Sequence, residues 1–456
     1  MSLTFDLFII GGGPAGYFAA EEAAKGGLKT VLAEKEHMGG TCLNEGCVPT
    51  KTILNSAKIY SHAKEGGAYG VMAKDITLDH TAVIERKRSV IKKLVSGVER
   101  GVKSCGAKII REEAYILGKN AEGFQVKAGE EEYTAKNLLI AAGSVTSVPP
   151  IAGLKEALDS GYAVTSRELL ELEKVPQSLV IIGAGVIGLE FAAYFAAAGT
   201  KVTIVEMLDH VGVNFDRELA DMMQRKLERS GVQFLLSTKV TGLTADGVTW
   251  EKDGQVGETK SELALLCVGR KPNPADIGLA NIGVMTERGA VVTDKHMQTN
   301  VPGVYAAGDI NGKFSLAHTA YREGAVAVNN ILGKHDVMRY DAIPSVIYAD
   351  PEAASVGYTE EEAKAAGLDV KVVRVDANYS GRFLAENDGG EGVLKLVAEK
   401  ATGRILGMQA CGTYSAEFIA QGATFIEMGM TAKDLQEIVY PHPTVCELIR
   451  EAAFKF

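Results

Sequence analysis

Two cysteines in a glycine-rich segment are the residues of this chain best suited to do chemistry. Cys42 and Cys47 lie five positions apart in Gly-Gly-Thr-Cys-Leu-Asn-Glu-Gly-Cys-Val-Pro-Thr-Lys, residues 39–51. On a regular helix their Cα atoms would be about 8–9 Å apart, too far for a disulfide. A bridge therefore requires a distorted backbone, which Gly46 allows. Taken alone, the two side chains could equally be unreactive buried cysteines.

The residues that follow predict a helix that begins near Cys47. Pro49 suits the first turn of a helix, and residues 52–63 can continue it. The positive end of the helix dipole would then favour the thiolate form of Cys47.

A glycine-rich turn follows a buried-strand pattern at residues 5–10. An alanine-rich stretch, residues 17–25, predicts the next helix, and residues 30–33 predict a second strand. The glycines of the turn and the acid that ends the second strand are Gly11, Gly13, Gly16 and Glu34. Such glycines let the backbone approach a pyrophosphate at the helix N-terminus, and the acid can accept ribose hydroxyls. The pattern predicts a dinucleotide-binding unit.

A second copy of this pattern occupies the middle of the chain. Strands are predicted at residues 179–182 and 202–205, with a helix at 189–198 between them. Its glycines and terminal acid are Gly183, Gly185, Gly188 and Glu206. Two copies, with a cysteine pair after the first, indicate a tightly held flavin dinucleotide and an exchangeable nicotinamide dinucleotide. Glu206 favours NAD, because its carboxylate would repel the 2′-phosphate of NADP.

The segment 39–51 resembles the redox-active disulfide segment of the flavin-dependent pyridine nucleotide disulfide oxidoreductases, in the branch of dihydrolipoamide dehydrogenase, glutathione reductase and mercuric reductase. The resemblance covers almost the whole chain. It implies FAD at the first turn and NAD at the second. It also implies that Cys42 meets the substrate and that Cys47 faces the flavin. Lys51 would lie beside the flavin, positioned by an ion pair with Glu190.

Further segments match this family. Residues 138–144, with Gly143, and residues 269–273, with Gly269, resemble the two crossings between the flavin domain and the second domain. Residues 299–309 resemble the segment whose final Asp309 accepts hydrogen bonds from the flavin ribityl chain. Directly after Ala317, His318 is expected to begin an alanine-rich helix whose N-terminal amides can support negative charge on the flavin ring.

A histidine near the C-terminus completes the resemblance. His442 lies in Tyr-Pro-His-Pro-Thr-Val-Cys-Glu, residues 440–447. An isolated histidine is usually an ordinary hydrogen-bonding residue, but the family match implies a general base whose ring Glu447 orients. In the family this pair reaches into the active site of the partner subunit, so a homodimer is implied.

The expected fold class is α/β, with two Rossmann-like FAD/NAD(P)-binding domains and a C-terminal α+β dimerisation domain. The expected boundaries are 1–148 and 268–339 for the FAD-binding domain, 149–267 for the NAD-binding domain and 340–456 for the interface domain.

Composition narrows the class of protein. The 456 residues include 58 acidic and 48 basic side chains, a net charge of −10 that argues against a nucleic-acid partner. The apolar runs are too short to cross a bilayer, and no signal peptide is recognisable at the start. Six scattered cysteines fit a reducing cytoplasm, where a disulfide would be catalytic. No metal site is expected.

The substrate is the least constrained expectation. The C-terminus lacks the vicinal cysteines of mercuric reductases, and Glu206 opposes the NADP preference of glutathione reductases. Dihydrolipoamide is therefore favoured, on a lipoyl-bearing protein of a 2-oxoacid dehydrogenase or glycine cleavage complex. Thr50, Thr319 and Tyr440 stand where relatives often have other residues, which leaves a reductase of another disulfide or of mercuric ion open. A flavoprotein subunit without catalysis is the other alternative.

Overall fold

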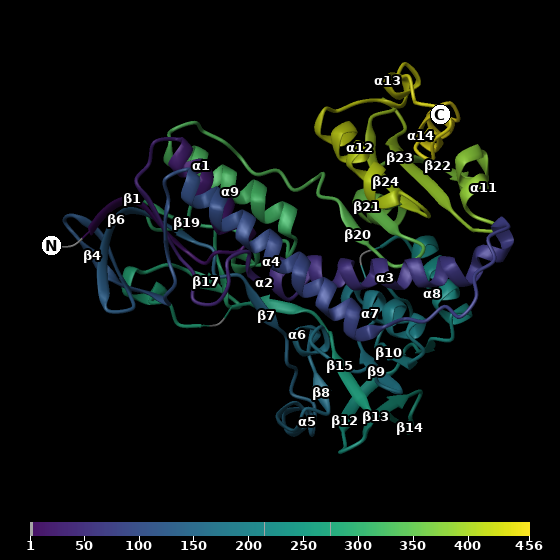
Figure 1. Cartoon of the computed structure of the whole chain (residues 1–456). Coiled ribbons are helices and arrows are strands. Elements are labelled where there is room, and N and C mark those ends of the chain that lie inside the picture. Colours follow the sequence, from purple (N-terminus) through teal and green to yellow (C-terminus); the bar gives the residue numbers. More distant parts are fainter. Residues whose placement is uncertain (1–2, 214, 274) are drawn as a thin grey trace. The chain divides into compact units, whose positions relative to one another are not determined.

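The computed structural model describes residues 3–213, 215–273 and 275–456, and the chain forms two compact units (Figure 1). Unit 1 comprises the chain up to Pro49, Glu85–Ser147 and Gly269–Arg339, and unit 2 comprises Thr50–Ile84, Val148–Val268 and Tyr340–Phe456. Helices α3 (Cys47–Glu65) and α4 (His80–Ser104) each contain residues of both units.

Unit 1 is built on a seven-stranded sheet in the order β3-β2-β1-β6-β5-β4, with β19 also paired to β6. Strand β1 is parallel to β2 and to β6, and Leu7, Phe8 and Ile9 in it are fully buried. Apolar residues on both faces are typical of a parallel sheet covered on both sides. Helix α1 packs on β1 and β2, and α9 lies beside α1. Its elements are β1 (Leu3–Ile10), α1 (Pro14–Lys25), β2 (Thr30–Ala33), α2 (Gly40–Asn44), β3 (Lys108–Ile110), β4 (Ala114–Asn120), β5 (Gly123–Ala128), β6 (Glu131–Ile140), β7 (Ser144–Thr146), β16 (Arg270–Pro272), η2 (Leu279–Ile282), β17 (Thr286–Glu287), β18 (Ala290–Val291), β19 (Val304–Ala306), η3 (Asp309–Asn311) and α9 (Ala317–Ile331).

The first part of unit 2 is a second parallel sheet, ordered β11-β10-β9-β15-β8, with an antiparallel sheet β12-β13-β14 beside it in the chain. Alternate residues of its strands belong to two apolar clusters: Leu179 and Ile181 of β9 pack in one cluster with helix α7, and Val180 and Ile182 belong to the other. The elements are η1 (Gly66–Tyr69), α5 (Leu154–Ser160), β8 (Ala163–Val164), α6 (Ser166–Leu169), β9 (Ser178–Ile182), α7 (Val186–Ala197), β10 (Lys201–Val205), α8 (Arg217–Arg229), β11 (Gln233–Leu235), β12 (Lys239–Leu243), β13 (Gly247–Lys252), β14 (Gln255–Lys260) and β15 (Leu263–Leu266).

The C-terminal part of unit 2 is an antiparallel sheet ordered β20-β21-β24-β23-β22. Helix α12 packs on β21 and β24, and α14 packs on β22 and β23. The elements are β20 (Ser345–Ile347), β21 (Ala353–Gly357), α10 (Glu360–Ala365), β22 (Val370–Asp376), η4 (Ala377–Tyr379), α11 (Gly381–Glu386), β23 (Val393–Glu399), β24 (Ile405–Cys411), α12 (Ser415–Glu427), α13 (Ala432–Gln436) and α14 (Glu447–Ala453).

The predicted α/β fold class is confirmed, with one systematic difference at the two glycine turns. Helices α1 and α7 each begin three residues earlier than predicted, so that Gly16 and Gly188 lie inside the first helical turn. A Cβ at Gly16 would lie 1.8 Å from the Gly11 carbonyl oxygen, and one at Gly188 would lie 2.3 Å from that of Gly183. These glycines therefore belong to the helices and do not precede them. Their lack of a side chain lets each helix pack closely on its glycine turn.

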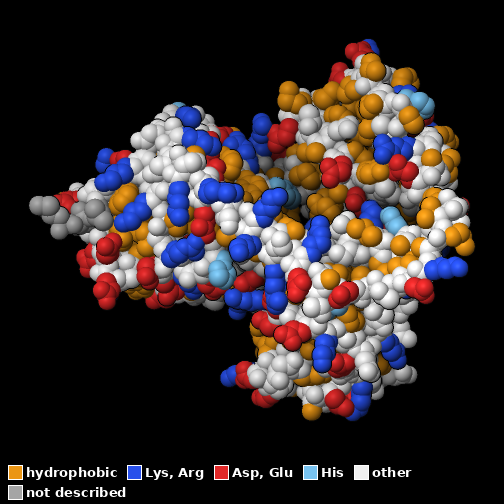
Figure 2. All heavy atoms as spheres, in the orientation of Figure 1, with side chains coloured by type: hydrophobic (Ala, Val, Ile, Leu, Met, Phe, Trp, Pro, Cys, Tyr) orange, Lys and Arg blue, Asp and Glu red, His pale blue; other side chains and the backbone are white. Residues whose placement is uncertain are grey.

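The surface carries both signs of charge. Figure 2 shows acidic and basic side chains interspersed on the visible face of each unit. Over the C-terminal part the same view shows many hydrophobic side chains, and large apolar residues exposed in that part include Met428, Val439 and Phe454. Not one helix in residues 3–213, 215–273 and 275–456 combines the length and apolar character needed to cross a membrane.

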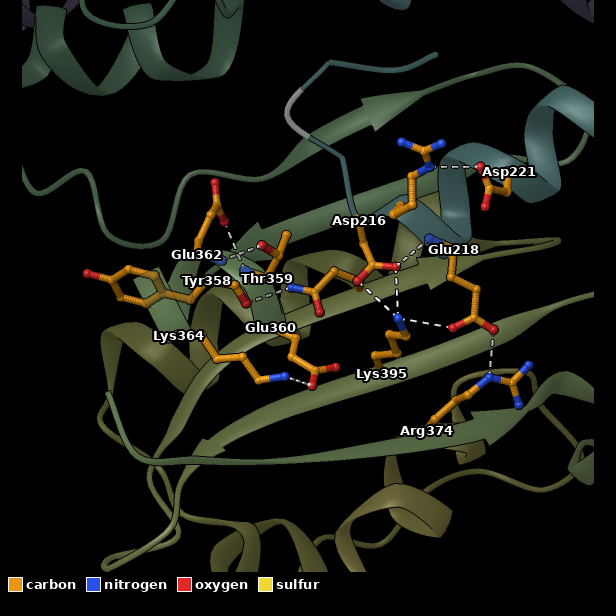
Figure 3. Close-up of polar contacts among 12 residues, drawn as sticks. Asp216, Glu218, Asp221, Tyr358, Thr359, Glu360, Glu362, Lys364, Arg374 and Lys395 are labelled. Atoms are coloured by element: carbon orange, nitrogen blue, oxygen red, sulfur yellow. Dashed lines mark hydrogen bonds and ion pairs between the residues drawn. The ribbon is translucent and has the colours of Figure 1, made fainter. Parts of the chain in front are cut away.

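Within unit 2, two acids at the start of α8 hold two basic residues of the C-terminal sheet (Figure 3). The Lys395 Nζ lies 2.9 Å from Asp216 Oδ1 and 3.0 Å from Glu218 Oε2. The Arg374 Nε lies 2.6 Å from Glu218 Oε1. Lys395 and Arg374 are cross-strand neighbours, so their like charges would repel each other without the acids.

The contribution of these ion pairs to the stability of the fold decreases at low pH and at high pH. Burial disfavours the charge of Lys395, but its bonds to Asp216 and Glu218 raise its pKa above 10.5. Burial likewise opposes the charge of Glu218, whose bonds to Arg374 and Lys395 hold its pKa below 4.5. The ion pairs therefore stabilise the fold fully at pH values between 4.5 and 10.5, the ordinary pKa values of the two groups. This contribution is lost as pH falls through the lowered pKa of Glu218 or rises through the raised pKa of Lys395.

Replacing Lys395 by methionine is expected to destabilise unit 2 by about 3 kcal/mol, because Asp216 stays buried without its partner. Thermal unfolding should show a midpoint several degrees lower. The matched control is Lys400→Met, which removes an exposed pair with Asp369 and should change little. Equal midpoints for the two variants would contradict a stabilising role of the network.

Candidate active site

The cysteine segment is divided between two helices. Cys42 lies in α2, which ends at Asn44, and Cys47 is the first residue of α3. Glu45, with φ −138° and ψ 9°, lies outside the helical region and ends α2. The Asn44 side chain stabilises this arrangement by donating to the Gly40 carbonyl oxygen at 2.9 Å. The distorted backbone that a Cys42–Cys47 bridge requires is therefore present.

The six cysteines differ in exposure. Cys47 is exposed and Cys42 is half-buried, whereas Cys267 and Cys411 are buried. Burial raises the pKa of the Cys411 thiol to about 12 and raises that of Cys267 as well. Buried thiols of this kind stay protonated and inert. The segment 39–51 thus carries two of the reachable cysteines of the chain.

The Glu34 carboxylate, which ends the first dinucleotide pattern, accepts hydrogen bonds from the backbone of the glycine turn and of the loop after β2. Glu34 Oε2 accepts the Gly12 N–H at 2.7 Å, and Glu34 Oε1 accepts the Glu36 N–H at 2.7 Å. The carboxylate therefore ties the glycine turn to the end of β2, a role that the sequence did not reveal. Each oxygen keeps a lone pair that could accept a ribose hydroxyl.

The second turn repeats this geometry in unit 2. Glu206 Oε2 accepts the Ala184 N–H at 2.7 Å, and Oε1 accepts the Leu208 N–H at 2.8 Å. A Cβ at Gly185 would meet nothing within 4 Å, so the backbone above the start of α7 is open to a ligand. The open turn and its acid fit a dinucleotide pyrophosphate and ribose.

Asp309 of unit 1 is held by the two crossing strands. The Ser144 hydroxyl on β7 donates to Asp309 Oδ2, and the Arg270 Nε on β16 donates to that hydroxyl at 2.8 Å. Strands β7 and β16 pair antiparallel. Their flanking glycines, Gly143 and Gly269, have φ angles of +71° and +109°, which glycine adopts without strain.

A buried acid on α9 fixes the turn before Asp309. Glu323 is fully buried, and its Oε2 accepts the Gly308 N–H at 2.6 Å. Two nearby polar atoms, Asn311 Nδ2 and Thr319 Oγ1, are buried and have no hydrogen-bond partner within the described parts of the chain. Thr319 lies in the first turn of α9, directly after Ala317 and His318. Unused polar groups of this kind, together with the glycine turn at α1, fit a flavin dinucleotide.

The predicted ion pair of unit 2 is present. Lys51 Nζ lies 2.9 Å from both carboxylate oxygens of Glu190. Glu190 is 2% exposed, and it also accepts the Tyr348 N–H at 3.0 Å. The Lys51 ammonium lies 4.6 Å from the centre of the Tyr348 ring. Three contacts therefore fix the lysine at one place.

The predicted histidine and acid also meet. His442 Nδ1 lies 3.0 Å from Glu447 Oε1, and the Thr444 N–H donates to Glu447 Oε2 at 2.8 Å. Burial opposes the charge of Glu447, but the Thr444 N–H, His442 and Arg450 hold its pKa below the usual value. The His442 side chain is 78% exposed, so its second ring nitrogen is free to meet a substrate. The arrangement suits a general base.

The structure distributes these groups over both units. Cys42, Cys47 and Asp309 belong to unit 1, and the pairs Lys51–Glu190 and His442–Glu447 belong to unit 2. In the described ranges, no group of three or more His, Cys, Asp or Glu side chains has the arrangement of a metal site.

The chain is similar to known proteins over almost its whole length. Residues 5–324 match the family model described as pyridine nucleotide-disulphide oxidoreductase, and residues 343–453 match the dimerisation domain of the same group. The dihydrolipoyl dehydrogenase of Geobacillus stearothermophilus is 39% identical over 454 residues, which are 98% of this chain and 95% of the relative. That of Mycoplasma pneumoniae is 36% identical over 456 residues, covering 99% and 98%. Among solved structures, the HOCl-induced flavoprotein disulfide reductase RclA from Escherichia coli has a TM-score of 0.86 at 27% identity, covering 98% and 99%.

Proposed function

Because the chain belongs to the pyridine nucleotide-disulphide oxidoreductase family, we propose that it oxidises dihydrolipoamide with NAD through a redox-active pair of Cys42 and Cys47. The substrate is proposed from full-length relatives at 36% and 39% identity that carry the name dihydrolipoyl dehydrogenase. The observation that carries the proposal is the break between α2 and α3, which leaves Cys47 exposed at the start of a long helix.

The proposed reaction uses His442 as the base. Its imidazole takes the proton of one substrate thiol, and the resulting thiolate attacks the sulfur of Cys42 in a Cys42–Cys47 disulfide. The disulfide breaks, and Cys47 leaves as a thiolate that the N-terminus of α3 stabilises. The second substrate thiol then attacks the mixed disulfide and passes its proton to the departing Cys42 sulfur, so that the substrate leaves as a cyclic disulfide and Cys42 is released as a thiol.

The cofactors of the family fit the two turns. FAD would be held by Gly11, Gly13, Gly16, Glu34 and Asp309, and NAD by Gly183, Gly185, Gly188 and Glu206. FAD supplies the acceptor for the two electrons that the cysteines take up, and NAD supplies the final acceptor. The ion pair with Glu190 holds the Lys51 side chain, and the family resemblance implies that this lysine would lie beside the flavin.

The proposed partners follow from the same family. A dimerisation domain at residues 343–453 supports a homodimer in which His442 serves the partner subunit's cysteine pair. The exposed apolar side chains of this part, such as Val439 at 93% exposure, are suited to burial between two copies. A lipoyl-bearing protein of a 2-oxoacid dehydrogenase or glycine cleavage complex would supply the dithiol.

The test is steady-state turnover of the purified FAD-loaded protein. We expect fast NADH formation from dihydrolipoamide and NAD, and much slower turnover with NADP because of the Glu206 carboxylate. The comparison assays use glutathione disulfide with NADPH, and mercuric ion with NADH or NADPH. Turnover in these assays, but not with dihydrolipoamide, would contradict the proposed substrate and assign a reductase instead.

A further inference from the structure

Two tyrosine hydroxyls of unit 1 are in hydrogen-bond contact. The hydroxyl oxygens of Tyr17 on α1 and Tyr321 on α9 are 2.5 Å apart. Their rings meet edge to face, with centroids 5.8 Å apart. Both side chains are half-buried, so the pair borders on solvent rather than lying in the core. The two residues are separated by 304 positions in the chain, and only the packing of α9 on α1 joins them.

The backbone brings Tyr17 to the cysteine segment. A Cβ on Gly40 would lie 2.7 Å from the Gly13 Cα, so the start of α2 rests directly on the first turn of α1. The Tyr17 N–H donates to the Gly13 carbonyl oxygen at 3.0 Å, which places Tyr17 one turn further along α1. Cys42 lies two residues after Gly40 in α2.

The packing of helix α9 on α1 brings Tyr321 next to Tyr17. A Cβ on Gly324 would lie 2.8 Å from the Ala15 carbonyl oxygen, so no side chain separates the two helices there. Tyr321 lies one turn before Gly324 and packs against Phe18, with ring centroids 5.7 Å apart. Close helix packing therefore fixes both tyrosine rings.

The electrostatics connect the pair to the cysteines. Burial raises the pKa of Tyr17, and the Tyr321 hydroxyl and negative charge at Cys42 and at Glu21, on the next turn, raise it further. Burial also raises the pKa of Tyr321; its bond to Tyr17 acts in the opposite direction, and charge at Cys42 and Cys47 adds to the rise. Both hydroxyls therefore keep their protons at neutral pH and remain donors.

We propose that the Tyr17–Tyr321 pair is a hydrogen-bond donor to the sulfur anion of Cys42 in the reduced enzyme. One of the two hydroxyl protons lies between the oxygens, and the other is left to donate outside the pair. A hydroxyl that donates to an anion favours the charged form, so in this proposal the pair sets the fraction of Cys42 present as thiolate. The pair transfers no proton, because the substrate proton goes to His442. This inference rests on the proposed role of Cys42 as the exchanging thiol.

The test measures the titration of Cys42 directly. The FAD-loaded protein is reduced with a phosphine and treated with iodoacetamide across a pH series, and the peptide that carries Cys42 is quantified by mass spectrometry. We expect Tyr17→Phe and Tyr321→Phe each to raise the midpoint of Cys42 alkylation, and the double variant to raise it by about one pH unit. That shift corresponds to about tenfold less thiolate at a pH below both midpoints.

The matched control removes a hydroxyl from a similar pair in unit 2. Tyr162→Phe deletes the partner of the Ser261 hydroxyl, 3.0 Å away, and should leave the Cys42 midpoint unchanged. An unchanged midpoint in the double variant, or an equal shift in the control, overturns the proposal. Phenylalanine keeps both rings in place, and bound FAD with the thermal midpoint verifies folding. If the double variant does not hold FAD, the two single variants decide.

The readout does not depend on turnover with any dithiol. Failure of the proposed function would appear as retained activity after loss of Cys42. Failure of the present inference would appear as an unchanged alkylation midpoint in an otherwise active enzyme. The two outcomes are therefore distinguishable.

Discussion

Cys42→Ser and Cys47→Ser proteins are expected to retain FAD and to lose dithiol-dependent NADH formation by about a thousandfold or more. A serine oxygen forms no disulfide, so the mixed disulfide with substrate cannot form or cannot resolve. The groups proposed to hold FAD are other residues of unit 1, at the α1 turn and at Asp309, which is why the flavin should stay bound. Flavin absorbance and steady-state turnover measure the two effects separately.

The control for this prediction is Cys105→Ser. Cys105 is half-buried and follows α4 in the same unit, and it takes no part in the proposed reaction. Its replacement should leave turnover unchanged. Peptide mapping of the oxidised wild-type protein should find Cys42 joined to Cys47. Full activity in Cys42→Ser would remove the cysteine pair from the mechanism.

His442→Gln is expected to lower turnover with dihydrolipoamide by about a hundredfold to ten-thousandfold, the usual contribution of a general base. Reduction of the flavin by NADH should be unaffected, because no substrate thiol is involved in that step. Glu447→Gln should have a smaller effect, since the ring keeps a hydrogen-bond partner but loses the carboxylate that compensates its positive charge. The control is His62→Gln, an exposed histidine on α3.

The same variants test whether His442 serves the partner subunit. A heterodimer of one Cys42→Ser chain and one His442→Gln chain, isolated with two different tags, combines two inactive proteins. If each site takes its cysteines from one chain and its histidine from the other, the heterodimer has one intact site and about half of the wild-type activity. If both groups belonged to one chain, the heterodimer would be inactive.

Local patterns were sufficient for the elements that carry the chemistry. The two glycine turns, their strands and helices, and the helix that begins at Cys47 are present, because each is specified by residues close in the chain. Family membership is likewise confirmed, since the resemblance rested on residues 39–51 and on two complete dinucleotide patterns. The pairs Lys51–Glu190 and His442–Glu447 were expected from that resemblance and are present.

Contacts between residues far apart in the chain could not be predicted from these local patterns. Glu34 and Glu206 were interpreted as ribose acceptors, but the structure shows that each also accepts two backbone N–H groups. The starts of α1 and α7 were placed three residues too late, because a glycine inside a helix has low propensity and only the close packing of the turn explains it.

The sequence by itself determined the class of chemistry: a cysteine pair, two dinucleotide turns and a histidine with its acid, each recognisable within a short stretch. The tertiary structure alone decided which distant residues surround them. Tyr17 meets Tyr321, and Lys395 meets Asp216, across 304 and 179 positions of chain. Such contacts depend on how helices pack on one another and on sheets. No periodicity or spacing in the chain encodes that packing, because it depends on side chains that are far apart in the sequence.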